Sequence, residues 1–163
     1  MDWYAISWRL CNETYNGLEA IFENEMVSER LDWDVLNDNM QLSSILKCAY
    51  SSYARWDWSN ITERCETDFI IDNLSRYADL WDWDIILSQK FSADYIQSDE
   101  NLRSIKNVLS LLDDSKKEKC WESVTRAFEP YELLSLSEEK NTENGYFWDY
   151  SYIYDAIDNP ELS

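Results

Sequence analysis

The stretch Trp81-Asp82-Trp83-Asp84-Ile85-Ile86-Leu87-Ser88 recurs in altered form along this chain of 163 residues. Its second tryptophan, here called the anchor, is followed three residues later by an apolar side chain. An apolar pair follows the anchor at twelve and thirteen residues. The first four anchors are spaced by 25 residues, and the last two follow at spacings of 38 and 29. The anchors are Trp8, Trp33, Trp58, Trp83, Trp121 and Tyr150. Self-similarity at such a period indicates a repeat array.

The composition favours helices, because two glycines and two prolines are too few for a sheet with many tight turns. Each repeat is expected to form two short helices. Asp57 can cap a helix that begins at Trp58, and Thr67 and Ser92 can cap second helices. We expect one all-α domain over residues 1–163, a short α-solenoid of about six helix-turn-helix repeats of 25 residues. The regular repeats span about residues 1–100 and the repeats with insertions about 101–163.

Helices of this length are marginal alone, so each must bury its apolar stripe against the next repeat. The anchors Trp8, Trp33, Trp58 and Trp83 are expected to stack as one aromatic spine. The extra residues before Trp121 predict a longer amphipathic helix that ends within 113–117. Residues 141–145 are expected to form an exposed loop.

The net charge is −19, from 33 acidic and 14 basic residues. Such a charge repels nucleic acid and anionic membranes and favours a basic partner. The alternative is that the charge serves only solubility. Because the N-terminus lacks a signal-like segment and no apolar run is long enough for a membrane span, we expect a cytoplasmic protein. If a phage or virus encodes it, the compartment is the host cytoplasm. The cysteines are expected to be reduced thiols.

The chain has no histidine, which excludes imidazole bases and histidine metal sites. Gly17 and Gly145 cannot make a glycine-rich phosphate loop. Residues 32–39 offer oxygen ligands but lack the glycine and final glutamate of a calcium loop. We therefore expect no catalytic residues, no metal and no cofactor. An enzyme that uses a pair of carboxylates stays a minor alternative.

The aspartate before an anchor can act as a helix N-cap, as part of a functional acidic stripe, or as both. Other acids interleave with the apolar columns and should point away from the core. The predicted acidic face for binding a partner comprises Asp32, Asp34, Asp57, Glu63, Glu66, Asp68, Asp72, Asp79, Asp82, Asp84, Asp94, Asp99 and Glu100.

The phrase Trp81-Asp82-Trp83 with the later Phe91-Ser92-Ala93-Asp94-Tyr95-Ile96 resembles the tryptophan-anchored short helical repeats of some giant-virus and bacterial proteins. The resemblance covers about residues 31–97 well and the rest loosely. It implies a helical-repeat architecture. Such repeats carry no catalytic residues, so the resemblance assigns none here.

Two functions follow from these features. The first is a DNA-mimic inhibitor, whose carboxylates occupy the basic nucleic-acid-binding surface of a partner protein. Acidic anti-restriction and anti-CRISPR proteins of phages are similar to this chain in size and charge. The second is a helical scaffold for protein–protein interaction that binds through aromatic side chains. The aromatic candidates are Trp3, Tyr4, Trp56, Trp81, Tyr146 and Phe147.

Overall fold

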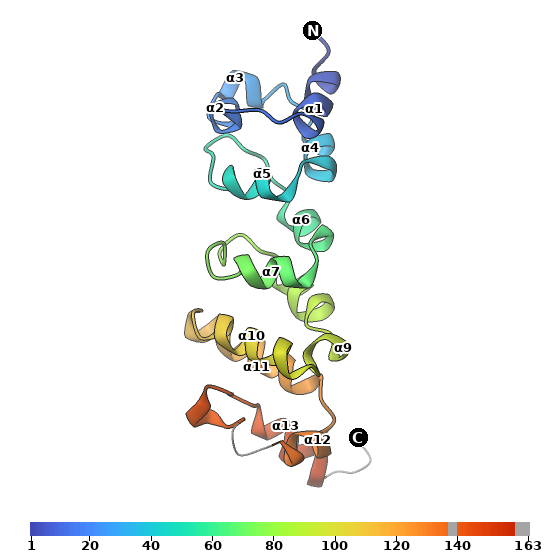
Figure 1. Cartoon of the computed structure of the whole chain (residues 1–163), viewed down its shortest axis with the longest axis vertical. Helices are drawn as coiled ribbons and strands as arrows, with labels where there is room; N and C mark the ends of the chain where they lie inside the picture. The colour runs from blue at the N-terminus through green and yellow to red at the C-terminus, as the bar shows by residue number, and fades with distance from the viewer. Residues whose placement is uncertain (137–139, 159–163) are drawn as a thin grey trace. The chain divides into compact units, whose positions relative to one another are not determined.

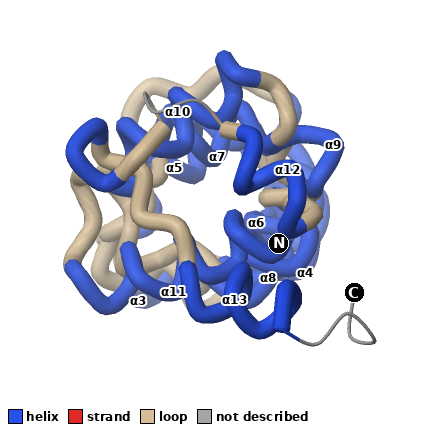
Figure 2. The backbone as a smooth tube through the Cα atoms, turned by 90° about the horizontal axis from the view of Figure 1, so that it is seen from below, coloured by secondary structure: helices blue, strands red, loops and turns tan. Residues whose placement is uncertain are grey.

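The computed structural model describes residues 1–136 and 140–158. Within these ranges the backbone forms helices and loops and no strand (Figure 2), which confirms the all-α class. The chain divides into two compact units, Met1–Cys65 (unit 1) and Glu66–Ser163 (unit 2), and each is described by itself. The single solenoid of six repeats stays a prediction.

Unit 1 contains short helices only (Figure 1). Helix α1 packs against α4, and α4 packs against α6. Figure 1 shows α1, α4 and α6 one after another, with α2, α3 and α5 on the other side of the unit. The bounds are α1 Trp3–Asn12, α2 Leu18–Phe22, α3 Glu25–Ser28, α4 Trp33–Asn39, α5 Leu42–Lys47 and α6 Trp58–Arg64.

Unit 2 contains the longer helices. Helix α7 packs against α10, the π-helix η1 packs against α11, and α12 packs against α13. The bounds are α7 Thr67–Asn73, α8 Trp83–Ile85, η1 Ile86–Lys90, α9 Ala93–Ile96, α10 Asp99–Leu109, α11 Asp114–Arg126, α12 Pro130–Ser135, the 3-10 turn η2 Thr142–Asn144, and α13 Tyr150–Asp158.

In four repeats, an aspartate N-cap fixes the residue at which the first helix begins. The carboxylate of Asp57 accepts a hydrogen bond of 3.1 Å from the backbone N–H of Asn60, as predicted. Equivalent bonds of 3.1 to 3.2 Å are made by three other aspartates: Asp2 at α1, Asp32 at α4 and Asp82 at α8. Each bond satisfies one of the amide groups that the first turn of a helix leaves unpaired.

The anchor of the first repeat is Trp3, and the prediction of Trp8 is wrong. Trp3 follows the cap Asp2 and begins α1, as Trp33 follows Asp32 and begins α4. Trp8 lies in the middle of α1. Trp3 and Trp33 are 30 residues apart, so the first repeat is longer than the 25-residue period. The short helices α2 and α3 occupy the segment between α1 and α4.

The fifth repeat also departs from the prediction. Residues 113–117 do not end the preceding helix, which stops at Leu109. Asp113 instead caps α11, where its carboxylate accepts a bond of 2.9 Å from the N–H of Lys116. Trp121 therefore lies inside a 13-residue helix and does not begin one.

The second helices lack the predicted side-chain caps. The N-cap of α7 is Glu66, and Thr67 is the first helical residue. The Thr67 hydroxyl donates to the carbonyl of Lys90 at 3.3 Å. Ser92 does occupy the N-cap of α9, but its side chain makes no capping bond. Pro130 begins α12, where a missing N–H has no cost.

The aromatic contacts of Trp33 and Trp121 are made with a tryptophan just before the next anchor, and the stacking of the four anchors as one spine stays a prediction. In unit 1 the anchor Trp33 packs against Trp56, two residues before the next anchor, with ring centroids 5.0 Å apart. In unit 2 Trp121 packs against Trp148 in the same way at 5.4 Å. The indole N–H groups of Trp56 and Trp148 each donate to a carbonyl eight residues earlier, at 3.0 and 2.9 Å. Trp56 and Trp148 therefore each hold the connecting loop and pack against the preceding anchor.

A column of buried polar residues lies four residues after the anchors. Its members bond back to the anchor carbonyl, with distances between 2.6 and 2.8 Å. They are Ser7, Asn37, Thr62 and Thr125. Three of them also accept the backbone N–H of the aspartate that begins the next repeat: Ser7 from Asp32, Asn37 from Asp57 and Thr125 from Asp149, all at 2.8 Å.

The fourth repeat carries Leu87 at this polar position. Its helix changes there to the π-helix η1, which Phe91 closes by donating to the carbonyl of Ile86 at 3.0 Å. The carbonyl of Leu87 accepts a bond of 3.2 Å from the hydroxyl of Ser123 in α11. The bond between Ser123 and Leu87 thus stands where other repeats have a bond between a polar side chain and the next aspartate. It lies in the repeat after which the spacing between anchors lengthens to 38 residues.

Candidate interaction surface

Three members of the predicted acidic face serve as helix caps. Asp57 is exposed, whereas Asp32 and Asp82 are half-buried. Their carboxylates each hold a backbone N–H of the first helical turn. The capping role is thus observed, and a second role in binding stays a prediction.

The other ten predicted acids are all exposed. Two belong to unit 1, and the remaining eight belong to unit 2, so they are considered as two separate sets. The set in unit 1 is Asp34 and Glu63; the set in unit 2 is Glu66, Asp68, Asp72, Asp79, Asp84, Asp94, Asp99 and Glu100.

Few of these exposed acids are neutralised within the chain. Asp99 lies 2.5 Å from the Lys140 ammonium, and this hydrogen bond lowers the pKa of the Asp99 carboxyl. Asp79 lies 3.7 Å from Lys116, and Asp68 accepts a bond from the Tyr95 hydroxyl. Six acids make no ion pair within residues 1–136 and 140–158: Asp34, Glu66, Asp72, Asp84, Asp94 and Glu100.

The predicted aromatic candidates separate by exposure. Trp81 and Tyr146 are buried, at 3% and 7% exposed, and Trp3 and Trp56 are half-buried. Tyr4 and Phe147 are exposed, at 54% and 46%. A scaffold that binds through aromatic side chains would therefore have Tyr4 in unit 1 and Phe147 in unit 2.

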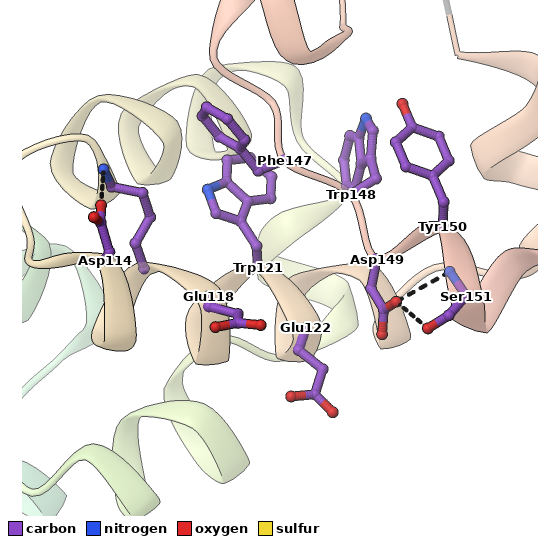
Figure 3. Close-up of a pocket in the computed structure, with 10 residues that line it drawn as sticks. Asp114, Glu118, Trp121, Glu122, Phe147, Trp148, Asp149, Tyr150 and Ser151 are labelled. Atoms are coloured by element: carbon purple, nitrogen blue, oxygen red, sulfur yellow. Dashed lines mark hydrogen bonds and ion pairs between the residues drawn. The ribbon is translucent and has the colours of Figure 1, made fainter.

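A groove of about 690 Å³ lies in unit 2, where α11 meets the segment that leads into α13 (Figure 3). This volume is within the range of sites that hold a small molecule. The lining residues are Asp114, Lys117, Glu118, Trp121, Glu122, Phe147, Trp148, Asp149, Tyr150 and Ser151.

The apolar wall of the groove is a cluster of rings around Trp121. Phe147 and Trp148 meet the Trp121 ring edge to face, with centroids 6.4 and 5.4 Å away. Trp121 and Trp148 are buried by this packing, whereas Phe147 and Tyr150 each remain 46% exposed. The accessible part of the wall is therefore the rings of Phe147 and Tyr150.

The charged edge of the groove holds four carboxylates and one ammonium. In Figure 3 the rings rise on one side of α11, and the side chains of Glu118 and Glu122 lie along the opposite edge. Asp114 pairs with Lys117 at 3.5 Å, and Glu122 pairs with Arg126 at 2.5 Å. Glu118 is exposed and makes no ion pair within the described part of the chain.

Asp149 is the fourth carboxylate of the groove. It accepts hydrogen bonds from the hydroxyl and the backbone N–H of Ser151, at 2.5 and 3.1 Å. The hydroxyl bond is the main reason that the pKa of Asp149 lies below its ordinary value. Asp149 is therefore a structural anion at the start of α13.

Other kinds of site find little support. The four cysteines are buried, and burial raises the pKa of Cys120 to about 12 and that of Cys48 to about 11. In the described ranges no three residues among cysteines and acids gather as metal ligands. The same ranges contain no helix with the length and apolarity to cross a membrane. Residues 32–39, weighed above as a calcium loop, form the cap and body of α4.

Comparison of the chain with protein-family models, curated proteins and solved structures found no match. The resemblance to tryptophan-anchored repeats therefore rests on the sequence phrases alone.

Sequence reasoning missed the groove and the polar column. The column had a visible signal, because a Ser, Asn or Thr follows four residues after Trp3, Trp33, Trp58 and Trp121. Choosing Trp8 as the first anchor hid this regularity. The groove had no such signal, since it joins residues of α11 to residues about 30 positions later.

Proposed function

We propose that this chain is a non-enzymatic binding protein that occupies the basic, nucleic-acid-binding surface of a partner protein. The observation that carries the proposal is that six exposed carboxylates, one in unit 1 and five in unit 2, make no ion pair within the described residues of a chain of net charge −19. Proteins that bind nucleic acid use lysine and arginine for phosphate contacts. Helix-mounted carboxylates present the same charge to those side chains as phosphates do.

Short, capped helices support this function because they hold carboxylates at fixed positions. Asp34 and Asp84 each follow an anchor in the first turn of a capped helix, and Asp94 lies in the first turn of α9. Negative charge is favourable at a helix N-terminus, so these side chains fit their positions without needing a cation. They remain available to an external basic group.

A binding assay with a competitor tests the proposal. The purified chain is immobilised, proteins are captured from lysate at low salt, and bound proteins are eluted with duplex DNA at constant ionic strength. We expect the eluted proteins to be nucleic-acid-binding proteins and their capture to weaken steeply with salt, because exposed charges are screened. Capture that survives molar salt and is indifferent to duplex DNA would contradict the proposal.

Matched variants locate the surface. The triple variant Asp72→Asn, Asp94→Asn, Glu100→Gln removes three acids of the predicted face in unit 2. The control variant Glu25→Gln, Glu29→Gln, Glu143→Gln removes three exposed acids outside the predicted face. Both change the net charge equally, so a general charge effect would weaken capture equally. The proposal expects a larger loss for the first variant.

The alternative is a helical scaffold that mediates protein–protein interaction without nucleic-acid mimicry. The exposed rings of Phe147 and Tyr150 beside the groove favour it. A partner captured at high salt, not displaced by duplex DNA and lost with Phe147→Leu would support this alternative.

A further inference from the structure

We propose that the groove between α11 and residues 147–151 binds an arginine side chain of a basic segment of the partner protein. This inference rests on the proposed function, because it names the chemistry that one part of the surface would recognise. It concerns unit 2 alone.

The shape and polarity of the groove suit an amphipathic cation. Phe147 and Tyr150 contribute exposed rings to the lining of the groove, and Glu118 contributes a carboxylate. Arginine has an apolar stem that packs on such rings and a charged head that seeks an anion. A neutral apolar ligand would leave the carboxylate edge unused, and an anion would be repelled by it.

Three of the four carboxylates in the groove already have a partner within the chain. Lys117 already neutralises Asp114 at one end, and Arg126 neutralises Glu122. Asp149 is engaged by the N–H and hydroxyl of Ser151. Glu118 therefore remains as the acceptor for the ligand, between the two internal ion pairs along α11.

Arginine fits this arrangement better than lysine. The planar guanidinium can lie on an aromatic ring while its N–H groups reach a carboxylate in a bidentate manner. The lysine ammonium is a compact, strongly hydrated charge that loses more on leaving water. The ring cluster behind Phe147 is fixed by the Trp121 contacts, so little ordering is required on binding.

The experiment titrates the full chain with a fluorescent peptide of alternating arginine and glycine at about 0.15 M salt, where distant charges are screened. The same peptide with lysine in place of arginine is the ligand control. We expect one tight site per chain, and weaker binding of the lysine peptide. Phe147→Leu and Glu118→Gln should each raise the Kd roughly 5- to 30-fold.

Two control variants match these changes outside the groove. Tyr131→Leu removes an exposed ring on α12, and Glu143→Gln removes an exposed charge on η2. Both should leave the Kd within about 2-fold of the parent, an effect typical of one screened surface charge. The inference would be overturned if the Kd rose equally in the groove and control variants, or if it rose in neither groove variant. If Phe147→Leu fails to fold, Glu118→Gln still decides the result.

The outcomes separate this inference from the proposed function. If the groove variants capture the DNA-displaceable partner normally while the acidic-face variant does not, the groove inference falls and the proposed function stands. If the arginine peptide binds the groove but no captured protein is displaced by duplex DNA, the proposed function falls and the groove inference stands.

Discussion

The backbone N–H of Asp149 donates a hydrogen bond of 2.8 Å to the hydroxyl of Thr125, a residue 24 positions earlier. Thr125 is fully buried, and its hydroxyl also donates to the carbonyl of Trp121 at 2.7 Å. One hydroxyl therefore ties the end of α11 to the start of the last repeat. The bonds of Ser7 to Asp32 and of Asn37 to Asp57 do the same in unit 1.

Replacing Thr125 with valine should destabilise the fold, because it keeps the shape but leaves the N–H of Asp149 without its acceptor. We expect a loss of roughly 1–3 kcal/mol in the free energy of unfolding, the usual cost of an unsatisfied polar group. Urea denaturation measures it. Thr125→Ser retains the hydroxyl and should recover most of the loss; an equally unstable serine variant would count against the hydrogen bond.

Two variants of Asp57 distinguish the effect of helix capping from the effect of surface charge. Asp57→Ala removes the acceptor for the N–H of Asn60 and should cost about 1 kcal/mol. Asp57→Asn removes the charge but keeps a good cap, so its melting temperature should stay near that of the parent. If the asparagine variant is as unstable as the alanine variant, the carboxylate acts through its charge and not as a cap.

The anchor role of Trp33 can be tested against Trp8. The Trp33 indole donates to the carbonyl of Ser28 at 2.9 Å, and its ring packs against Trp56. Trp33→Phe should therefore cost roughly 1–3 kcal/mol, because the Ser28 carbonyl loses its donor. Trp8→Phe should cost less by the same denaturant titration. If Trp8→Phe lowered the free energy of unfolding more than Trp33→Phe, the result would favour Trp8 as the anchor.

The cysteines should react slowly in the folded protein. Burial raises the pKa of Cys120 to about 12 and that of Cys48 to about 11, so both remain thiols at mildly alkaline pH. The thiolate is the reactive form. A chromogenic disulfide reagent should modify the native thiols slowly and all four quickly in denaturant. Fast labelling of any native cysteine would show that its surroundings open.

Asp149 should make the last helix sensitive to acid. Its folded pKa is lower than the ordinary unfolded value of ~3.9, mainly because the Ser151 hydroxyl donates to it. The resulting stabilisation is present above the unfolded pKa and is lost as the pH falls through the folded pKa. The difference in melting temperature between the parent and Asp149→Ala should be constant near neutral pH and shrink in acid. A difference that persists in strong acid would contradict the assignment.

Local features of the fold were predictable, and features set by distant contacts were not. The cap at Asp57 and the exposure of ten predicted acids follow from neighbours within one helical turn. The N-cap at Glu66 was missed because the Thr67 hydroxyl bonds instead to Lys90, 23 residues away.

The candidate site shows the same division. The charge that defines the acidic face is a property of composition and helical periodicity, and so it was visible in the chain itself. The groove depends on α11 meeting residues 147–151, which the lengths of the inserted segments do not specify. Phe147 was recognised as a candidate, but neither Glu118, which lines the same groove, nor the ring packing on Trp121 was.

The sequence by itself determined the helical class, the repeated Asp-Trp helix starts and the negative charge, because capping and amphipathic periodicity act between residues a few positions apart. The tertiary structure alone decided where η1 replaces the polar column and which rings remain exposed at the groove. Those features depend on hydrogen bonds and ring contacts between segments more than 20 residues apart, and no local pattern encodes their pairing.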